Sequence, residues 1–308
     1  MESIVVIKDV TKVIKGRTII DNISFDVNKG EVFGFLGPNG AGKTTTIRMI
    51  VGLIDITSGD ITIGGSSIKT KFEDAVRHVG AIVENPEMYK FLSGYQNLIH
   101  YARMVKGITK DKIDETVKLV GLSDRIHDKV KTYSLGMRQR LGLAQCLLHD
   151  PKVLILDEPT NGLDPAGIRE IRDYIRLLAR EKGMAVIVSS HILSEMEMMC
   201  DRIGIIQNGR LIDVQMVQEF VHGNTASFEF EIIPSEKAMT LLKTQFSTIP
   251  ATNSRNGITL ELPKEDVPAM VKKFVEEDIQ VYGIKEVSKT LEDRFLEVTS
   301  DKETVDHD

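Results

Sequence analysis

Several features that mark secreted or membrane-spanning proteins are scarce in this sequence. Its 308 residues include two cysteines and no tryptophan, and no apolar run reaches the roughly 18 residues that a membrane-spanning helix needs. Cys146 and Cys200 each lie in an apolar helical pattern, which predicts buried thiols of a reducing compartment rather than a disulfide or a metal site. No apolar signal segment follows Met1. We therefore expect a soluble chain that reaches any membrane through a partner.

An excess of positive charge is also missing. The chain carries 39 basic and 45 acidic side chains, a net charge of −6, which argues against a nucleic-acid-binding surface. Residues 221–308 account for −7 of this charge and residues 1–220 for +1. Together with the length, this break predicts a large domain over 1–220 and a small one over 221–308.

The larger expected domain alternates apolar strands with helices. Continuous apolar runs at 153–157 and 185–189 are each followed by a helical pattern, which is typical of an α/β fold whose parallel sheet is covered on both faces. Helical periodicity from about 92 to 149 predicts a helical insert in this domain. The dipeptide Asn208-Gly209 predicts a hairpin.

The smaller expected domain has a different pattern. Strict alternation over 227–233 and 258–262 predicts strands, and an apolar stripe at helical spacing follows each of them. A last helix is expected to open at Thr290, with Asp293 completing a capping pattern. These segments predict a small α+β accessory domain.

A glycine-rich segment between an apolar strand and a helix fits the pattern G-x-x-x-x-G-K-[ST]. In that arrangement successive backbone N–H groups and the positive end of the helix surround phosphate groups. Lys43 would reach the β- and γ-phosphates, and Thr44 would offer its hydroxyl to Mg²⁺. The alternative is a purely structural turn. The candidate ATP-binding residues are Gly37, Pro38, Asn39, Gly40, Ala41, Gly42, Lys43, Thr44 and Thr45.

Charged side chains follow two of the apolar strands. Asp157 ends the run at 153–157, at the expected carboxyl edge of the sheet, where it could hold Mg²⁺ while Glu158 polarises an attacking water. Such a pair also occurs as an ordinary helix cap or loop pair. His191 follows 185–189 and would reach the same edge as a γ-phosphate contact, although a lone histidine is more often a surface or core residue. Lys43, Glu158 and His191 are the catalytic candidates.

Four segments in this order and spacing resemble the nucleotide-binding domain of ABC transporters over roughly residues 4–220. They are the glycine-rich loop, YSLGMRQR at 133–140, LDEPTNGLDP at 156–165 and SSH at 189–191. The resemblance implies a P-loop NTPase core with an antiparallel β subdomain and an inserted helical subdomain. It also implies ATP and Mg²⁺ as cofactors, a head-to-tail dimer with ATP between two copies, and an integral-membrane permease partner at the cytoplasmic face of the cell membrane.

The resemblance assigns roles to further residues. YSLGM stands where the family usually has LSGGQ, and it keeps Ser134 and Gly136, the positions that meet the γ-phosphate held by the second copy. Asp164 matches the carboxylate of the loop that crosses the dimer seam. Ile14 departs from the family, which usually has an aromatic residue there that stacks on adenine. Glu84 replaces the glutamine that links the Mg²⁺ site to the membrane subunit, so it is a third metal candidate or else a solvated loop carboxylate.

Glu84, the YSLGM segment and TLEDRFLEVT at 290–299 are similar to the drug- and peptide-antibiotic-resistance branch, which includes bacitracin- and lantibiotic-type exporters. We therefore expect an exporter ATPase. A soluble ABC ATPase acting on ribosomes or DNA would usually carry two cassettes, coiled-coil heptads or zinc-binding cysteines. An importer ATPase would more often carry an all-β extension, and a non-enzymatic cassette would not keep the catalytic candidates.

Overall fold

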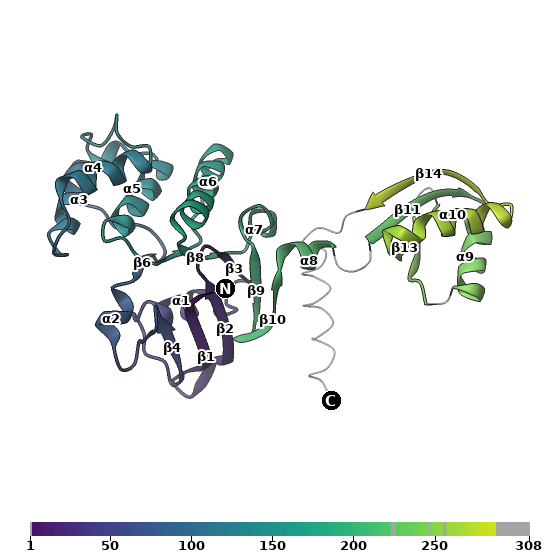
Figure 1. The fold of residues 1–308 in the computed structure, drawn as a ribbon, viewed down its shortest axis with the longest axis horizontal. Helices are drawn as coiled ribbons and strands as arrows, with labels where there is room; N and C mark the ends of the chain where they lie inside the picture. The colour runs from purple at the N-terminus through teal and green to yellow at the C-terminus, as the bar shows by residue number, and fades with distance from the viewer. Residues whose placement is uncertain (1, 223–225, 247, 255–256, 288–308) are drawn as a thin grey trace. The chain divides into compact units, whose positions relative to one another are not determined.

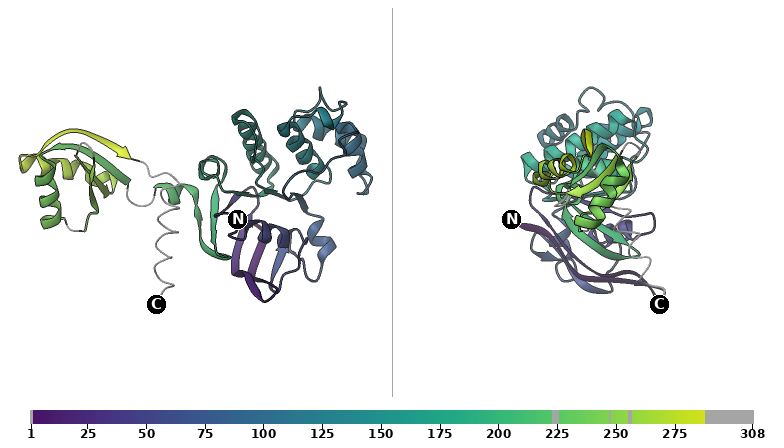
Figure 2. Two further views of the ribbon diagram at one scale, coloured as in Figure 1. Left: turned by 180° about the vertical axis from the view of Figure 1, so that it is seen from behind. Right: turned by 90° about the vertical axis from the view of Figure 1, so that its right-hand side faces the viewer.

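The computed structural model describes residues 2–222, 226–246, 248–254 and 257–287, and its fold is shown in Figures 1 and 2. The chain divides into two compact units, Met1–Gln215 and Met216–Asp308. The boundary predicted from the sequence, between residues 220 and 221, lies five residues later. The difference arises because the short helix α8 (Val217–His222) belongs to the second unit.

A six-stranded sheet forms the centre of the first unit. Its strands lie in the order β10 (Arg210–Met216), β9 (Arg202–Gln207), β3 (Val32–Leu36), β8 (Ala185–Ser190), β7 (Val153–Asp157) and β6 (Val79–Ile82). The pairs from β9 to β6 are parallel, and β10 returns beside β9 through the Asn208-Gly209 hairpin. Every residue of β3, β7 and β8 is buried, which explains why these strands are apolar almost throughout.

The strands β3, β8 and β7 end in step. Leu36 pairs in register with Ser190, and Ser189 pairs with Asp157. Because parallel strands end at the same edge of a sheet, the segments that follow these three strands meet there. The glycine-rich loop after β3 therefore begins beside the ends of β8 and β7.

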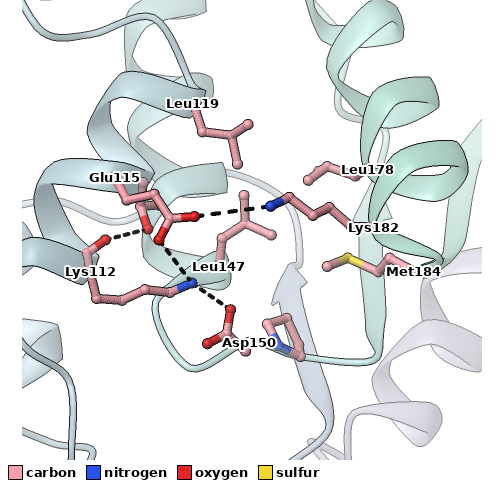
Figure 3. A pocket seen from close by; sticks show the side chains of 10 residues that line it. Lys112, Glu115, Leu119, Leu147, Asp150, Leu178, Lys182 and Met184 are labelled. Carbon is pink, nitrogen blue, oxygen red and sulfur yellow. Dashed lines mark hydrogen bonds and ion pairs between the residues drawn. The ribbon is translucent and has the colours of Figure 1, made fainter.

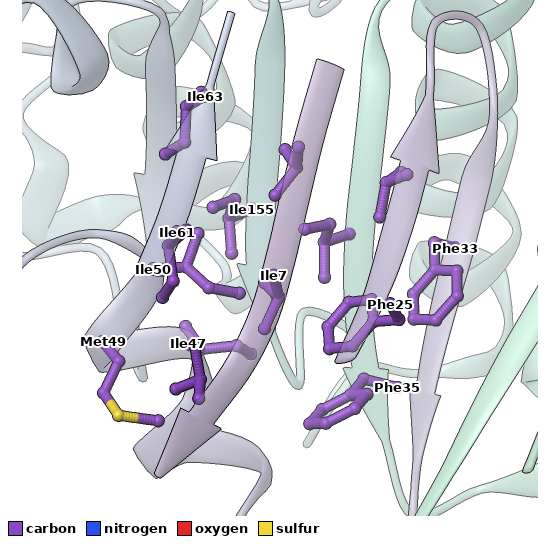
Figure 4. Close-up of a cluster of buried hydrophobic side chains, with 14 of the residues drawn as sticks. Ile7, Phe25, Phe33, Phe35, Ile47, Met49, Ile50, Ile61, Ile63 and Ile155 are labelled. Atoms are coloured by element: carbon purple, nitrogen blue, oxygen red, sulfur yellow. The ribbon is translucent and has the colours of Figure 1, made fainter. Parts of the chain in front are cut away.

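A second, antiparallel sheet shares its core with the first. Its order is β2 (Arg17–Asn28), β1 (Ser3–Ile14), β4 (Ser58–Ile63) and β5 (Ser66–Ser67). Its apolar side chains form one cluster with those of the central sheet and of helix α1 (Lys43–Ile50), as Figure 4 shows. Phe25 of β2 stacks on Phe33 of β3 with ring centroids 5.0 Å apart. This packing fixes β3 and α1, and with them the loop that joins the two.

The predicted helical insert lies between β6 and β7. It contains α3 (Gly94–Ala102), α4 (Lys110–Leu119), a 3₁₀ turn (Val130–Thr132) and α5 (Leu135–Leu147). Helices α2 (Phe72–Val76), α6 (Pro165–Lys182) and α7 (Leu193–Met199) complete the unit. In the part of the chain that the structure describes, no helix is long and apolar enough to cross a membrane.

Both thiols lie in these helical segments and are buried, as the sequence predicts. Cys146 belongs to α5, and Cys200 directly follows α7. Burial raises the pKa of Cys146 to about 12 and raises the pKa of Cys200 as well, so both remain protonated near neutral pH.

A pocket of about 150 Å³ marks the junction between α4 and α6, and Figure 3 shows the side chains that line it. Lys112 of α4 donates to Oδ1 of Asp150 at 2.5 Å, and Glu115 of α4 lies 4.0 Å from Nζ of Lys182 at the end of α6. Pairs between largely exposed side chains contribute about 0–1 kcal/mol each. Of these two pairs only Glu115–Lys182 joins the insert to α6, and it contributes far less than the apolar core that holds the two sheets together.

The second unit has the order β-α-β-β-α-β. Its elements are β11 (Ala226–Ile233), α9 (Ser235–Gln245), β12 (Ala251–Ser254), β13 (Gly257–Leu262), α10 (Val267–Glu276) and β14 (Gln280–Val287). The antiparallel strand order β12-β13-β11-β14 is the ferredoxin-like, split βαβ arrangement.

The core of this unit follows the alternation in the sequence. Phe228, Phe230 and Ile232 of β11 are buried together with side chains of both helices. Strand β12 is not among the expected elements, because its sequence Ala-Thr-Asn-Ser has no apolar alternation. The helix expected from Thr290 lies outside the described residues.

A chain that ends at His222 should fold, because among the described residues the two sheets of the first unit take no strand from beyond Met216. We expect a single cooperative thermal transition by circular dichroism. A chain that ends at Asp201 is the control: it lacks β9 and β10, leaves one edge of β3 unpaired, and should not fold. An insoluble His222 chain would show that the first unit depends on the second.

Candidate active site

The glycine-rich loop is shaped by close backbone packing. A Cβ on Gly37 would lie 2.3 Å from the carbonyl oxygen of Ile206, and one on Gly42 would lie 2.4 Å from Cδ1 of Ile20. Gly42 also has a φ of 113°, which side-chain-bearing residues rarely adopt. Helix α1 begins directly after it, and among the described residues no side chain caps its first turn. The free N–H groups and the positive end of the α1 dipole are thus directed toward the loop.

Lys43 is folded back over this loop. Its Nζ donates to the carbonyl oxygens of Gly37 at 2.6 Å and Pro38 at 3.2 Å, and the residue is only 5% exposed. Burial lowers the pKa of the Lys43 ammonium, whereas the negative charges of Glu158 and Asp157 oppose that shift. A buried cation beside backbone N–H groups is well suited to bind an anion.

Asp157, Glu158 and Ser189 form a hydrogen-bonded group at the ends of β7 and β8. Ser189 Oγ donates to Oδ1 of Asp157 at 2.5 Å. The N–H of Glu158 donates to the same Oγ at 3.0 Å and to the carbonyl oxygen of Ser189 at 3.2 Å. Glu158 has a φ of 49°, in the left-handed region, which turns the chain sharply after the strand.

His191 completes this group. Its Nδ1 lies 3.2 Å from Oε2 of Glu158. The structure therefore brings His191 and the Asp157–Glu158 pair together from two neighbouring strands.

The loop and the carboxylate face one open cavity of about 170 Å³. Its lining residues are Ile19, Asn39, Gly40, Gly42, Lys43, Thr44, Thr45 and Glu158. The cavity thus joins most of the predicted ATP-binding residues to the predicted catalytic carboxylate. Ile19 is an aliphatic member that the sequence analysis did not single out, whereas Ile14 is not among the lining residues and is 42% exposed at the end of β1.

Ser134 and Gly136 lie elsewhere in the unit. They line a second cavity of about 310 Å³ together with Asp164 and its loop. Two helices begin there: Ser134 Oγ accepts from the N–H of Met137 at the start of α5, and Asp164 Oδ1 accepts from the N–H of Gly167 at the start of α6. Neither Ser134 nor Gly136 lines the cavity of the glycine-rich loop.

Glu84 has a partner that the sequence analysis did not foresee. It follows β6 with a φ of 68° and forms an ion pair with Arg48 of α1. The Glu84 side chain is 64% exposed and does not line the cavity of the glycine-rich loop. Within the described ranges, no group of three or more His, Cys, Asp or Glu side chains is arranged to hold a metal ion.

The chain is similar over nearly its whole length to known ATP-binding proteins of ABC transporters. The sequence profile described as "ABC transporter" matches residues 20–161. The chain is 62% identical, over the full length of both proteins, to the uncharacterized ABC transporter ATP-binding protein YhcH of Bacillus subtilis strain 168. It is 40% identical to the bacitracin transport ATP-binding protein BcrA of Bacillus licheniformis, covering 97% of this chain and 98% of the relative.

A solved structure of an ABC transporter subunit is also similar to this chain. The ATP-binding subunit of an ABC transporter superposes with a TM-score of 0.64 at 28% identity, covering 71% of this chain and 92% of that one. This chain therefore belongs to the ATP-binding proteins of ABC transporters.

Proposed function

We propose that this chain powers an exporter that carries a peptide antibiotic or a drug through a separate membrane subunit. As an ABC ATP-binding protein it binds and hydrolyses ATP. The observation that carries the assignment of the site is that Lys43, Thr44 and Glu158 line one cavity, with His191 3.2 Å from Glu158. The cargo rests on the likeness to the bacitracin transport ATP-binding protein.

The residues at this edge fit a magnesium ion. Asp157 and Thr44 offer carboxylate and hydroxyl oxygens, the ligand atoms that Mg²⁺ prefers. Thr44 lines the cavity, and Asp157 is buried near enough to Lys43 for its negative charge to act on the pKa of the Lys43 ammonium. When bound, Mg²⁺ would neutralise charge on the phosphate oxygens. Glu84 is a further candidate ligand only if it leaves Arg48, because the structure holds it in that ion pair.

The side chains around the cavity divide the work of hydrolysis. Lys43 and the N–H groups of α1 would bind the β- and γ-phosphates. Glu158 would accept a hydrogen bond from the attacking water, and His191 would hold the Glu158 carboxylate in that direction. The left-handed backbone at Glu158 turns the chain directly after β7, and Glu158 lines the cavity.

The second cavity would act in trans. Ser134 and Gly136 lie at the N-terminus of α5 and do not line the cavity that holds Lys43. A second copy placed head-to-tail would bring its Ser134 and Gly136 against the γ-phosphate bound here, with Asp164 at the seam. ATP would thus hold two copies together, and its hydrolysis would release them.

Two observations favour an exporter ATPase over an importer ATPase and over a soluble ATPase that acts on a ribosome or DNA. The unit over 216–308 is a ferredoxin-like α+β fold, not the all-β extension expected of an importer. The net charge of −6 argues against a ribosome or DNA as the partner. We place the protein at the cytoplasmic face of the membrane, attached through an integral-membrane permease.

Glu158→Gln should still bind MgATP while turnover falls by about 10²-fold or more, because an amide cannot take up a proton from the attacking water. In ATP the variant should elute from a sizing column as a dimer, and without nucleotide as a monomer. Glu181→Gln, which changes an exposed carboxylate near the end of α6, is the matched control and should retain full turnover. Near-normal turnover of Glu158→Gln would assign the base to another residue.

We expect the protein to discriminate poorly between purine bases. Ile14 and Ile19 are aliphatic and lack the aromatic stacking contribution of about 0.5–1.5 kcal/mol. We expect GTP to be hydrolysed within about tenfold of ATP, and Ile14→Tyr to increase the affinity for purine nucleotides up to about tenfold. Initial rates and a fluorescent nucleotide titration measure both. A hundredfold preference for ATP in the unaltered chain would mean that another side chain stacks on adenine.

Glu84→Ala should leave most ATPase activity of the isolated subunit and abolish protection in cells that carry the membrane subunit. Glu84→Gln should protect partially, because it keeps the size of the side chain and loses its charge. Arg48→Gln should resemble Glu84→Gln, since it breaks the same ion pair. Minimum inhibitory concentrations of bacitracin, at matched expression levels, measure protection. Full protection by Glu84→Ala would reduce this residue to a solvated loop carboxylate.

A further inference from the structure

We infer that Ser189 is a positioning residue for hydrolysis, one that fixes the Asp157 carboxylate for the metal and supports the backbone turn at Glu158. This inference rests on the proposed function, because Asp157 and Glu158 have their roles only there. Ser189 itself lines neither cavity described above and would touch neither nucleotide nor metal. It would act through the two carboxylate-bearing residues that it contacts.

The hydroxyl of Ser189 is used on both sides. A serine hydroxyl has one proton to donate and two lone pairs to accept. Ser189 donates its proton to Oδ1 of Asp157 at 2.5 Å and accepts the N–H of Glu158 at 3.0 Å. The residue is 0% exposed, so water cannot replace either partner. One side chain therefore sets the orientation of Asp157 and one of the bonds at Glu158.

The hydrogen bond from Ser189 to Asp157 should affect metal binding more than the bond to Glu158 does. A bond of 2.5 Å from O–H to a carboxylate oxygen lies in the range of charge-assisted hydrogen bonds. It takes up one lone pair of Oδ1 and fixes the plane of the carboxylate, so the remaining lone pairs face a cation or its bound water in a set orientation. Hydrogen-bond partners that orient a metal-binding side chain typically affect metal affinity or activity by about 10–100-fold.

The backbone turn at Glu158 depends on two hydrogen bonds to Ser189, of which the side chain makes one. Its left-handed backbone, with a φ of 49°, is unfavourable for a residue with a Cβ atom. Both the carbonyl oxygen and the hydroxyl of Ser189 accept its N–H. Replacing the side chain removes only the second of these bonds, so the turn should loosen without being lost.

Ser189 differs from the buried serine next to it, because its hydroxyl bonds to a neighbouring strand and not to its own segment. The neighbouring Ser190, which is buried as well, accepts the N–H of Ile192 at 2.9 Å, a local turn bond two residues along the chain. Ser189 pairs in register with Asp157 of β7, so the two side chains lie on the same face of the sheet, whereas the side chain of Ser190 points to the opposite face. A serine with a purely structural role would alter stability and leave the response to metal unchanged.

Ser189→Ala tests this in the full-length chain. A fluorescent ATP analogue is titrated in EDTA and again in excess Mg²⁺, and steady-state turnover is measured on the same samples. We expect affinity in EDTA within about twofold of the parent, at least a tenfold smaller gain in affinity on adding Mg²⁺, and about a tenfold loss of kcat. Thr116→Ala is the matched control: Thr116 is 2% exposed, its Oγ1 donates to Lys112 O in α4, and its loss should leave both ratios unchanged.

A Ser189→Ala protein with an unchanged Mg²⁺ gain would overturn the inference, whatever its stability. If Ser189→Ala does not fold, Ser189→Cys replaces it, because sulfur keeps the shape and makes only weak hydrogen bonds. The same loss of Mg²⁺ gain is then expected, and a normal gain again refutes the role. Failure of the proposed function is separate: in that case the unaltered chain would itself show no Mg²⁺-dependent hydrolysis.

Discussion

The parallel register of β3, β8 and β7 is the constraint on which the whole site depends. Leu36, Ser190 and Asp157 end their strands in step, so the glycine-rich loop, His191 and Glu158 start from neighbouring points of one edge. A shift by one residue would turn every side chain of a strand to the opposite face. Every residue of β3, β7 and β8 is buried, so such a shift would bring each side chain against neighbours of a different shape in a closely packed core. Packing therefore fixes the register.

The separation of the two cavities follows from the same architecture. Lys43 and Glu158 lie where the sheet strands end, whereas Ser134 and Asp164 cap the helices α5 and α6 in another part of the unit. In the proposed function, each cavity would supply only some of the groups that contact a triphosphate. Two copies related head-to-tail would bring complementary halves together twice, which gives a closed dimer with two equal sites.

The sequence predicted the features that depend on local pattern. The buried strand ending at Asp157, the glycine-rich loop and the helical insert all follow from periodicity and motif spacing. The missed features depend on contacts between distant segments: the Arg48–Glu84 ion pair, the place of Ile19 in the cavity, and the Ser189 hydroxyl that joins β8 to β7. Two polar residues at the end of the run AVIVSS were a visible signal for Ser189, but only the strand order shows which neighbour it meets.

The central claim is that each ATP lies between the glycine-rich loop of one copy and the Ser134 segment of another. Mixing two inactive variants, Lys43→Ala and Ser134→Ala, tests this most directly. If the sites are shared, heterodimers contain one intact site, and an equimolar mixture should recover up to about a quarter of the parent ATPase activity. If each copy instead hydrolyses ATP alone, the mixture will stay as inactive as the two variants measured separately.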